Sequence, residues 1–318
     1  MSIQILNGGL QMTIQAGPRN GRRHKGVPAS GAADPVSHAL ANHLVGNPLD
    51  AASLEITLSG ARLLFEENSL IAITGGEAEI LHNSAHVQQH FSIFISSGDT
   101  LEIKALTKGA RTYVAIAGGI IAQTWLGSPS TYLPAKLAGY HGRALIAGDR
   151  LQLSQKYRPW KLTHPLTTPD HLHPYIGGSW MLRALPGPDF DCLTPAAQTN
   201  LFAKRFQVSN RASRMGVELS RQKLALTSDG KLPSAAVFPG TLQCPPSGKP
   251  FLLMADAQTT GGYPRIAQII RADRHMLGQL RPSDQIQLRR STPDEAAQIL
   301  KEKTELFRAW LGDTFQLR

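Results

Sequence analysis

Short alternating segments, each bounded by turn residues, dominate the first half of the chain and constrain its fold most strongly. The candidate strands are Leu54–Leu58, Arg62–Phe65, Leu70–Thr74, Ala78–Leu81, Phe91–Ile95, Thr100–Ile103 and Thr112–Ala117. Alternation of apolar and polar residues over such lengths is typical of half-buried strands. The 29 glycines and 21 prolines are scattered along the chain in short turn signals rather than gathered in one tract. The pattern predicts a mainly β protein whose strands form closed barrels or sandwiches.

One small unit recurs three times, as Gly98–Ile103, Gly148–Leu153 and Ser283–Leu288. In each copy a turn with an acidic residue leads into an alternating strand. The copies are too short to establish a duplication, but they indicate that both halves are built from similar β units.

Few helices are expected, and each is marked by its N-terminal cap. Asp34 precedes Pro35, and Val36, Leu40 and Leu44 then repeat at helical spacing before Gly46. Thr194 and Pro195 begin a second short helix, and the capping box Thr292–Glu295 begins a third. The predicted apolar face of this C-terminal helix consists of Ala296, Ile299, Leu300, Leu306, Phe307 and Trp310.

Between the two halves, residues 156–178 replace the alternating pattern with Pro, Thr and His. We interpret this stretch as a linker or long surface loop. The predicted domains are residues 1–160 and 179–318, with strands able to exchange between them. The linker contains His164, Asp170, His171 and His173. A metal site there is the alternative, but the spacing matches no ligand pattern that we can justify, so we expect no metal.

The formal net charge is +10, with a basic cluster at Arg19, Arg22, Arg23, His24 and Lys25. Because neither a groove-reading helix nor interleaved aromatic residues accompany it, we expect no nucleic-acid binding. The charge favours an anionic substrate, a nucleotide phosphate or an acidic partner protein.

Two cysteines, Cys192 and Cys244, are too few for a disulfide framework. The N-terminus does not resemble a signal peptide, and no apolar run approaches the ~18–20 residues that cross a bilayer. We therefore expect a cytoplasmic protein without a membrane association.

Common catalytic motifs such as a phosphate loop, a zinc-binding HExxH helix or a GxSxG nucleophile elbow do not occur. The strongest candidate site is Leu253–Pro264, where an apolar strand leads into Asp256, Gln258, Thr259 and Thr260. Their amide and hydroxyl groups can hydrogen-bond a carboxylate, amide or phosphate. The pair Gly261 and Gly262 and then Tyr263 complete the segment. The pair lets the backbone approach a ligand closely or adopt positive φ. A strand end with a tight turn is the alternative.

Two further segments carry candidate binding groups. The small-residue loop Gly26–Asp34, which contains Ser30, delivers a helix N-terminus that can hold an anion. Alternatively, Asp34 is only an N-cap. Arg214, in Ser213–Gly216, can bind a carboxylate or phosphate through two parallel hydrogen bonds, or else form an ion pair at a surface or between domains.

These segments together resemble a family of proteins similar to biotin-dependent carboxyltransferases. The family contains the C subunit of 5-oxoprolinase and allophanate hydrolase subunit 2. In the N-terminal half the resemblance rests on Gly26–Asp34, Gly46–Leu58, Ala115–Ile120 and Gly127–Thr131. In the C-terminal half it rests on Arg183–Pro188, Ser213–Gly216, Pro239–Gln243, Pro245–Gly248 and Asp256–Pro264. The similarity extends in order from about Ile3 to Ala297.

The resemblance implies two cyclophilin-like β-barrel domains with a few short helices. It also implies a B-type partner subunit of related fold (allophanate hydrolase subunit 1-like) and, in 5-oxoprolinase, an A-type subunit; a homo-oligomer is also open. The expected activity is the opening of 5-oxoproline to glutamate with ATP and Mg²⁺ at the level of the complex. The alternatives are a carboxyltransferase subunit of allophanate hydrolase or urea carboxylase type, for which biotin is the cofactor, and a non-catalytic regulator of a B-type, kinase-inhibitor-like partner.

Two positions depart from the family pattern. An acid usual near the N-terminus is Ala16 here, and an acid often found after the Gly-Ser-x-Ser-Thr motif is Tyr132. The N-terminal half therefore lacks two carboxylates that are typical of the family, and we expect no turnover by the isolated chain.

As an enzyme subunit, the chain is expected to use Asp256 as proton acceptor and Tyr263 or Thr260 as hydrogen-bond donor to a polarised carbonyl oxygen. Arg214 would engage an anionic group. Gln258, Thr259, Gly261, Gly262, Ser30 and Asp34 are the remaining predicted substrate contacts.

Overall fold

The computed structural model describes residues 2–154 and 166–317, and the contacts between residues divide the chain into two compact units. The described residues of unit 1 fall within Met1–Arg19, Asp34–Ile176 and Leu306–Phe315. Those of unit 2 fall within Asn20–Ala33, Gly177–Glu305 and Gln316–Arg318. Each unit therefore includes a short segment from the half of the sequence that otherwise builds the other unit.

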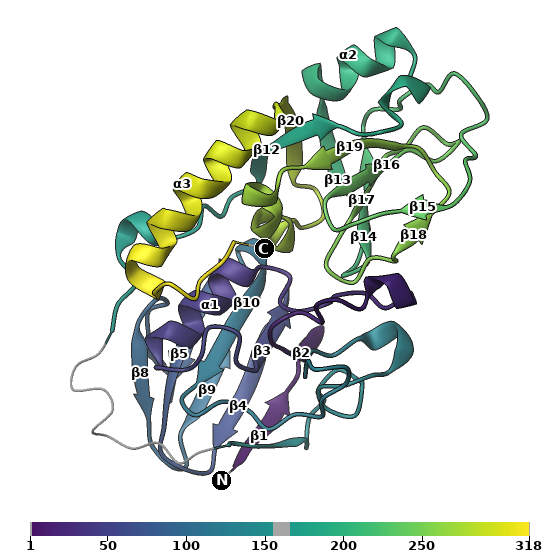
Figure 1. Cartoon of the computed structure of the whole chain (residues 1–318). Helices are drawn as coiled ribbons and strands as arrows, with labels where there is room; N and C mark the ends of the chain where they lie inside the picture. Colours follow the sequence, from purple (N-terminus) through teal and green to yellow (C-terminus); the bar gives the residue numbers. More distant parts are fainter. Residues whose placement is uncertain (1, 155–165, 318) are drawn as a thin grey trace. The chain divides into compact units, whose positions relative to one another are not determined.

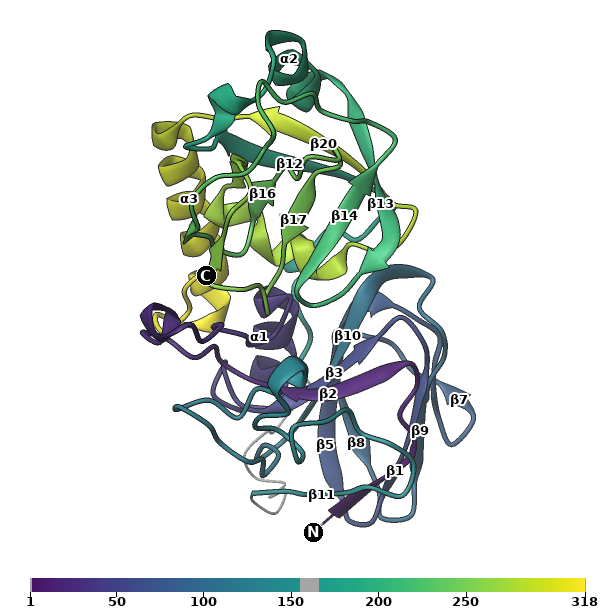
Figure 2. The ribbon, with the colours of Figure 1, turned by 90° about the vertical axis from the view of Figure 1, so that its right-hand side faces the viewer.

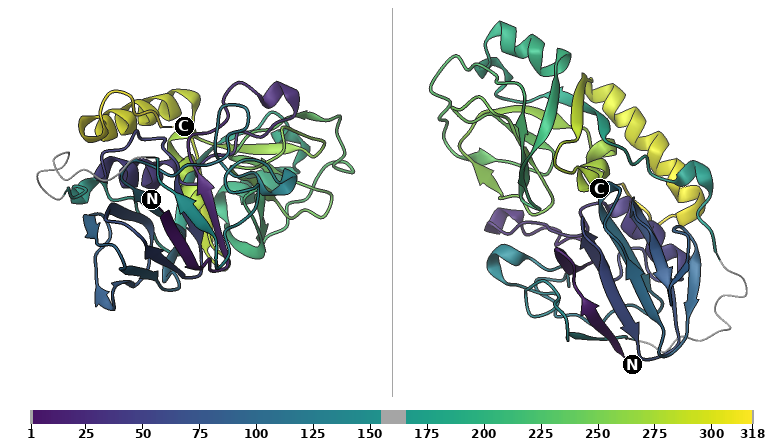
Figure 3. Two further views of the ribbon diagram at one scale, coloured as in Figure 1. Left: turned by 90° about the horizontal axis from the view of Figure 1, so that it is seen from below. Right: turned by 180° about the vertical axis from the view of Figure 1, so that it is seen from behind.

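Unit 1 contains two sheets whose strands pair antiparallel (Figure 1). The first has the order β11-β1-β4-β9-β6-β7 and consists of Arg150–Gln152, Ser2–Asn7, Ala61–Phe65, Thr100–Ile103, Ile80–His82 and Ala85–His86. The second has the order β2-β3-β10-β5-β8 and consists of Gln11–Gln15, Ser53–Thr57, Lys108–Ile116, Ser69–Glu77 and Ser92–Ile95. Helix α1 (Pro35–Leu44) packs against β5 and β10 of the second sheet (Figure 3).

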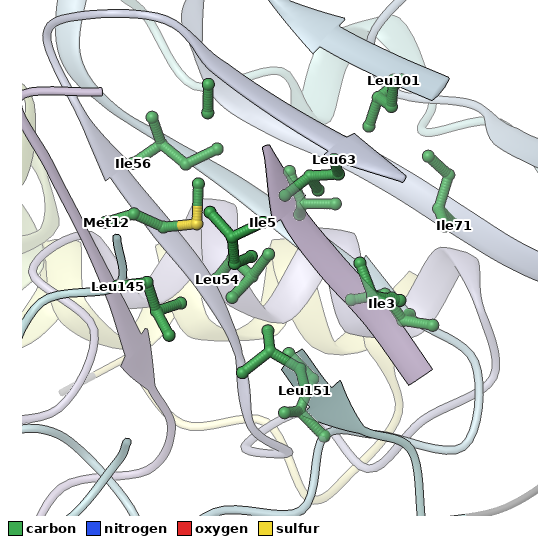
Figure 4. Packing of buried hydrophobic residues seen from close by; sticks show 14 of the residues in the cluster. Ile3, Ile5, Met12, Leu54, Ile56, Leu63, Ile71, Leu101, Leu145 and Leu151 are labelled. Atoms are coloured by element: carbon green, nitrogen blue, oxygen red, sulfur yellow. The ribbon is translucent and has the colours of Figure 1, made fainter. Parts of the chain in front are cut away.

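The core of unit 1 takes alternate residues from both sheets. In β1, Ile3 and Ile5 are buried while their neighbours are partly exposed, as a period of two requires. Leu63 and Leu101 from the first sheet, and Met12, Leu54, Ile56 and Ile71 from the second, belong to the same buried cluster (Figure 4).

Unit 2 is a closed barrel with the strand order β12-β19-β16-β17-β14-β13-β20 (Figure 2). Its strands are Ser179–Pro186, Arg265–Ile269, Thr241–Gln243, Phe251–Leu253, Gly216–Ser220, Arg205–Ala212 and Gln285–Arg290. The described ladders are antiparallel except for the parallel pair β12 and β20. A two-stranded sheet of β15 (Ala235–Ala236) and β18 (Thr260–Gly261) completes the unit. The prediction of a mainly β protein is confirmed.

The three recurring turn units form the same local structure. Their strands are β9, β11 and β20, and their acids are Asp99, Asp149 and Asp284. Each carboxylate accepts a hydrogen bond from the backbone N–H three residues earlier in the chain, at 2.8, 2.8 and 3.1 Å respectively. The acid recurs because it closes the turn that starts each strand.

The predicted helix caps are confirmed. The Asp34 carboxylate accepts from the N–H groups of Val36 and Ser37 at 3.1 Å each. Thr194 caps α2 (Pro195–Ala203), and the N–H of Glu295 donates to Thr292 Oγ1 at 3.2 Å at the start of α3 (Pro293–Leu311).

One detail of the helix predictions was wrong. Helix α3 has the length that its predicted apolar face requires, but Leu306 on that face is 46% exposed, because Phe307 and Leu311 form the buried side. The described residues also include five 3₁₀ segments, at Arg23–Lys25 (η1), Leu133–Ala135 (η2), Asp170–Leu172 (η4), Phe190–Cys192 (η5) and Arg271–Gln279 (η6). Both cysteines are free. Within residues 2–154 and 166–317, no helix has the length and apolar character needed to cross a membrane.

Of the predicted linker, residues 156–165 lie outside the described residues, and His164 is among them. The described part, from Leu166, pairs with unit 1: the N–H of Ser92 donates to Leu166 O and the N–H of Thr168 donates to His90 O, both at 3.0 Å. Among the described residues, no three His, Cys, Asp or Glu side chains are grouped to hold a metal ion.

His173, another residue of the predicted linker, stacks on His90 with 4.1 Å between ring centroids. Burial, with a smaller contribution from His173, lowers the pKa of His90 to about 4. Folding therefore favours neutral His90, so its contribution to stability is complete above about pH 6.5 and is lost as the pH falls towards 4.

Replacing His90 by Phe should remove this pH dependence while keeping an aromatic ring in the stack. Between pH 6.5 and 4 the unchanged protein should lose about 3 kcal/mol more unfolding free energy than His90→Phe, measured by denaturant titration at each pH. The exposed His86 offers a control, since His86→Phe should follow the unchanged protein. Parallel pH profiles for His90→Phe and the unchanged protein would contradict this interpretation.

Candidate functional site

The loop before α1 holds the most strained backbone among the predicted site residues. Ser30 has φ +52° and is 6% exposed, and Gly31 follows with φ +93°. The left-handed region is unfavourable for serine and is maintained only when the surroundings impose it. Ser30 Oγ is buried and has no hydrogen-bond partner among the residues that the structure describes. A buried, unsatisfied hydroxyl on a strained loop is a feature of ligand sites.

A buried ion pair between Arg214 and Asp256 lies in the same unit. Arg214 Nε donates to Asp256 Oδ2 at 2.8 Å and Nη2 donates to Oδ1 at 3.0 Å, with the side chains 5% and 1% exposed. The parallel, two-fold geometry is the strongest form of this interaction. The backbones are also joined, since the Asp256 N–H donates to Arg214 O at 2.8 Å and the Met254 N–H donates to Met215 O at 3.0 Å.

Arg214 also connects the barrel to the strained loop. Its Nη2 donates to Gly31 O at 2.6 Å. The carbonyl of the residue next to Ser30 is thereby fixed by a guanidinium whose own position Asp256 fixes. The structure thus brings together Ser30, Arg214 and Asp256, which the sequence placed in three separate motifs.

The segment after Asp256 is held mainly through its backbone and amides. Gln258 Nε2 donates to Gln243 Oε1 at 3.4 Å, and Gln243 Nε2 donates to Tyr263 O at 3.1 Å. Thr259 O accepts from the Val237 N–H at 3.0 Å. Thr260 is exposed, and its hydroxyl and that of Tyr263, 45% exposed, make no hydrogen bond within the described part of the chain.

The backbone at the glycine pair lies close to other parts of the protein. A β-carbon on Gly261 would lie 2.6 Å from Gln243 Nε2, and one on Gly262 would lie 2.9 Å from Leu232 O. Neither glycine has a positive φ, so the requirement for glycine here is steric rather than conformational.

This geometry bears on the roles expected of Arg214 and Asp256. Both oxygens of Asp256 accept from Arg214, and the two side chains are 1% and 5% exposed. Removing either partner would leave the other charge buried without its counter-charge. The arrangement favours a positioning role for the pair.

Asp34 belongs to unit 1, where it is fully buried and caps α1. Besides the two N–H groups named above, it accepts from the Ser37 hydroxyl at 2.6 Å. The free N–H groups predicted to seat an anion at this helix are therefore occupied in part by the protein's own carboxylate.

Unit 1 contains a buried polar network that sequence reasoning did not identify as a site. Tyr113 Oη accepts from the Asp34 N–H and donates to Glu55 Oε2, each at 2.8 Å. Arg111 Nε lies 3.4 Å from Glu55 Oε1. Burial, and then the charges of Glu55 and Asp34, hold the pKa of Tyr113 well above its usual value, so its phenol stays protonated. The sequence signal that could have identified this network is Glu55, a charged residue inside the otherwise apolar candidate strand Leu54–Leu58.

The two positions where family acids are replaced lie within unit 1. Ala16 is 2% exposed and its N–H donates to Ser130 Oγ at 3.0 Å. The N–H of Tyr132 donates to Leu137 O at 2.9 Å. Arg19, of the basic cluster, is buried here, with Nε donating to Trp125 O at 3.1 Å.

Comparisons with known proteins agree with this architecture. The family model "Carboxyltransferase domain, subdomain A and B" matches residues 25–290. The chain is 35% identical over 310 residues to the C subunit of 5-oxoprolinase from Escherichia coli, covering 97% of this chain and 98% of that protein. It is 33% identical to urea amidolyase of Lachancea kluyveri over 305 residues, covering 90% of this chain and 17% of that protein.

Among solved structures, urea carboxylase of Kluyveromyces lactis superimposes with a TM-score of 0.91 at 29% identity, covering all of this chain and 30% of that one. The family match spans both units and includes the Ser30 loop, Arg214 and Asp256. The chain belongs to the carboxyltransferase domain family that comprises subdomains A and B.

Proposed function

We propose that this chain is the C subunit of an ATP-dependent 5-oxoprolinase that converts 5-oxoproline to glutamate together with A- and B-type subunits. The observation that carries the proposal is the match to the Escherichia coli C subunit, since it covers 97% of this chain and 98% of that protein. In this proposal ATP, with Mg²⁺, is a substrate of the whole complex.

A second candidate is a carboxyltransferase subunit acting on a urea-like substrate. The identity to urea amidolyase and the superposition on urea carboxylase favour it, although the chain covers only 17% and 30% of those longer proteins. Biotin would then be carried by another domain or subunit. The partly exposed amide of Gln258, which donates to the buried Gln243, offers a donor and an acceptor that suit a ureido ring.

Within either proposal, the Ser30 loop is the group of this chain best placed to meet a carbonyl or carboxylate oxygen. Its hydroxyl is the unsatisfied donor, and Arg214 with Asp256 are the positioning residues that hold the loop. The exposed hydroxyls of Thr260 and Tyr263 remain candidate donors to a substrate carbonyl, and Gln258 and Thr259 candidate contacts.

The isolated chain should form no glutamate from 5-oxoproline and hydrolyse no ATP, because a half-site cannot orient both reactants and exclude water. Activity should appear when the chain is co-purified with A- and B-type subunits from its genomic neighbourhood, measured as 5-oxoproline-dependent ADP and glutamate formation. Robust turnover by the chain alone would contradict the shared site. Turnover of urea or allophanate by the complex in place of 5-oxoproline would support the second candidate. The absence of turnover with every combination of subunits would favour the regulatory alternative.

Removing the Ser30 hydroxyl should lower turnover of the assembled complex without unfolding the chain. Ser30→Ala keeps the β-carbon at positive φ and loses no protein hydrogen bond, so the unfolding free energy should change by less than about 1 kcal/mol. Turnover should fall roughly tenfold or more, as expected when a donor to a developing charge is lost.

Ser283 offers a matched control, since it is an exposed serine with φ +76° in the same unit. Ser283→Ala should leave turnover unchanged. Ser30→Gly should relieve the backbone strain and still be impaired, because it too lacks the hydroxyl. Full activity of both Ser30 variants would exclude the hydroxyl from the site.

A further inference from the structure

Arg23, a member of the basic cluster, anchors the N-terminal segment of unit 2. Its Nη2 donates to the carbonyls of Val237 and, at 3.2 Å, Gln258. Its guanidinium carbon lies 5.3 Å from the centroid of the Phe238 ring. Its Nη1 is buried without a hydrogen-bond partner among the described residues. The Nη2 group of Arg23 is thus fixed by two carbonyls, while its Nη1 group has no acceptor among the described residues.

Arg274, on η6, approaches the same turn from another part of unit 2. A β-carbon on Gly240 would lie 3.4 Å from its Nε, which is buried and has no acceptor in the described part of the chain. The turn itself is well braced, since the Thr241 N–H donates to Phe238 O at 3.0 Å and Thr241 Oγ1 donates to Gln268 Oε1 at 2.7 Å. Both arginines therefore contact one rigid turn, residues 238–241.

Within residues 2–154 and 166–317, no carboxylate forms an ion pair with Arg23 or Arg274. The nearest acid in sequence to Arg274, Asp273, is fully buried and taken up by Arg183, whose Nη2 and Nε donate to it at 2.6 and 2.9 Å. Burial, and then the positive charges of Arg271 and Arg23, lower the pKa of Arg274 to about 10. Arg271 is exposed, with its charge available to solvent.

Other arginines of unit 2 are neutralised by an aspartate of the same unit. Arg183, Arg214 and Arg265 each form a two-fold ion pair with one aspartate, namely Asp273, Asp256 and Asp189. Arg23 and Arg274 have no such partner among the described residues, although both are partly buried and their charges repel. A buried charge without a counter-ion is costly, so an anion from solution would stabilise the cluster.

We propose that Arg23, Arg271 and Arg274 form a binding site for a phosphoryl group beside the turn of residues 238–241. Three guanidinium groups suit a doubly charged ligand with three or more acceptor oxygens better than a single carboxylate, and arginine binds phosphate through two parallel hydrogen bonds. The site adjoins the segment of Asp256 through the Arg23 contact with Gln258. The proposal does not depend on which substrate the complex transforms.

The test is a thermal-shift and calorimetric titration of the full chain with inorganic phosphate, at ionic strength matched with potassium chloride. Phosphate should stabilise the unchanged protein beyond chloride. Arg271→Gln and Arg274→Gln should each weaken phosphate binding roughly tenfold or more, as expected for loss of a charged hydrogen bond. Arg211 is the control, since it is exposed and its Nη1 lies 3.2 Å from Glu218 Oε2. The phosphate affinity of Arg211→Gln should stay within about twofold of that of the unchanged protein.

A readout without ligand distinguishes this site from a structural role. In chloride alone, the melting temperature of Arg274→Gln should equal or exceed that of the unchanged protein. The substitution removes an uncompensated charge, and within the described part of the chain Arg274 Nε makes no hydrogen bond that could be lost. A lower melting temperature would assign Arg274 to the fold and overturn the proposal. So would the absence of phosphate-specific stabilisation, or equal weakening in Arg211→Gln.

Titrations with ADP and ATP identify the source of the phosphoryl group. Tighter binding of a nucleotide than of inorganic phosphate, lost in Arg274→Gln, would indicate a nucleotide phosphate. Equal binding of all three would indicate a free phosphate ion. Glutamate serves as the carboxylate probe, and binding of glutamate as tight as that of phosphate would contradict the preference for a phosphoryl group.

Discussion

The candidate site depends on one buried ion pair. Placing the guanidinium of Arg214 and the carboxylate of Asp256 at 5% and 1% exposure removes both from water at a cost of several kcal/mol each. The two parallel hydrogen bonds and the backbone bond between the same residues offset that cost. The pair then has one further consequence, because Arg214 holds the carbonyl of Gly31 and with it the strained conformation of Ser30.

Unit 2 uses arginine in two different ways. Where an aspartate is present, as for Arg183, Arg214 and Arg265, the guanidinium closes on it and fixes a strand end or a loop. For Arg23 and Arg274, nitrogen atoms remain buried without an acceptor among the residues that the structure describes. The first arrangement builds the scaffold, and the second provides the guanidinium groups of the proposed phosphoryl site.

Local features of this structure could be predicted from the sequence, because their causes are local. Thr100–Ile103 is a strand as predicted, and Asp34 and Thr194 cap their helices because a side-chain oxygen can reach N–H groups within three residues. The strands Ser2–Asn7 and Gln11–Gln15 were not predicted, although the alternation of Ile3 and Ile5 with polar neighbours is the same signal that identified the other strands.

The candidate site was predictable only in part. Ser30, Arg214 and Asp256 were predicted as site residues from their motifs. Asp256 was expected to accept a proton and Arg214 to bind an anionic group of the substrate, and the ion pair between the two was not predicted. Their pairing joins residues 42 positions apart, and its partner Gly31 lies 183 positions from Arg214, so no local pattern encodes it. Arg274 was missed for the same reason, since its surroundings are defined only when the barrel has closed.

A double-mutant cycle between Arg214 and Asp256 tests the central claim most directly. Arg214→Gln and Asp256→Asn should each lower the unfolding free energy by about 3–5 kcal/mol, since each leaves a buried charge unpaired. The double variant should lose less than the sum, with a coupling energy of about 2 kcal/mol or more. The exposed pair Arg211 and Glu218 is the control, and its coupling should stay below about 1 kcal/mol. Additive losses at Arg214 and Asp256, or a coupling no larger than that of the control pair, would contradict the account.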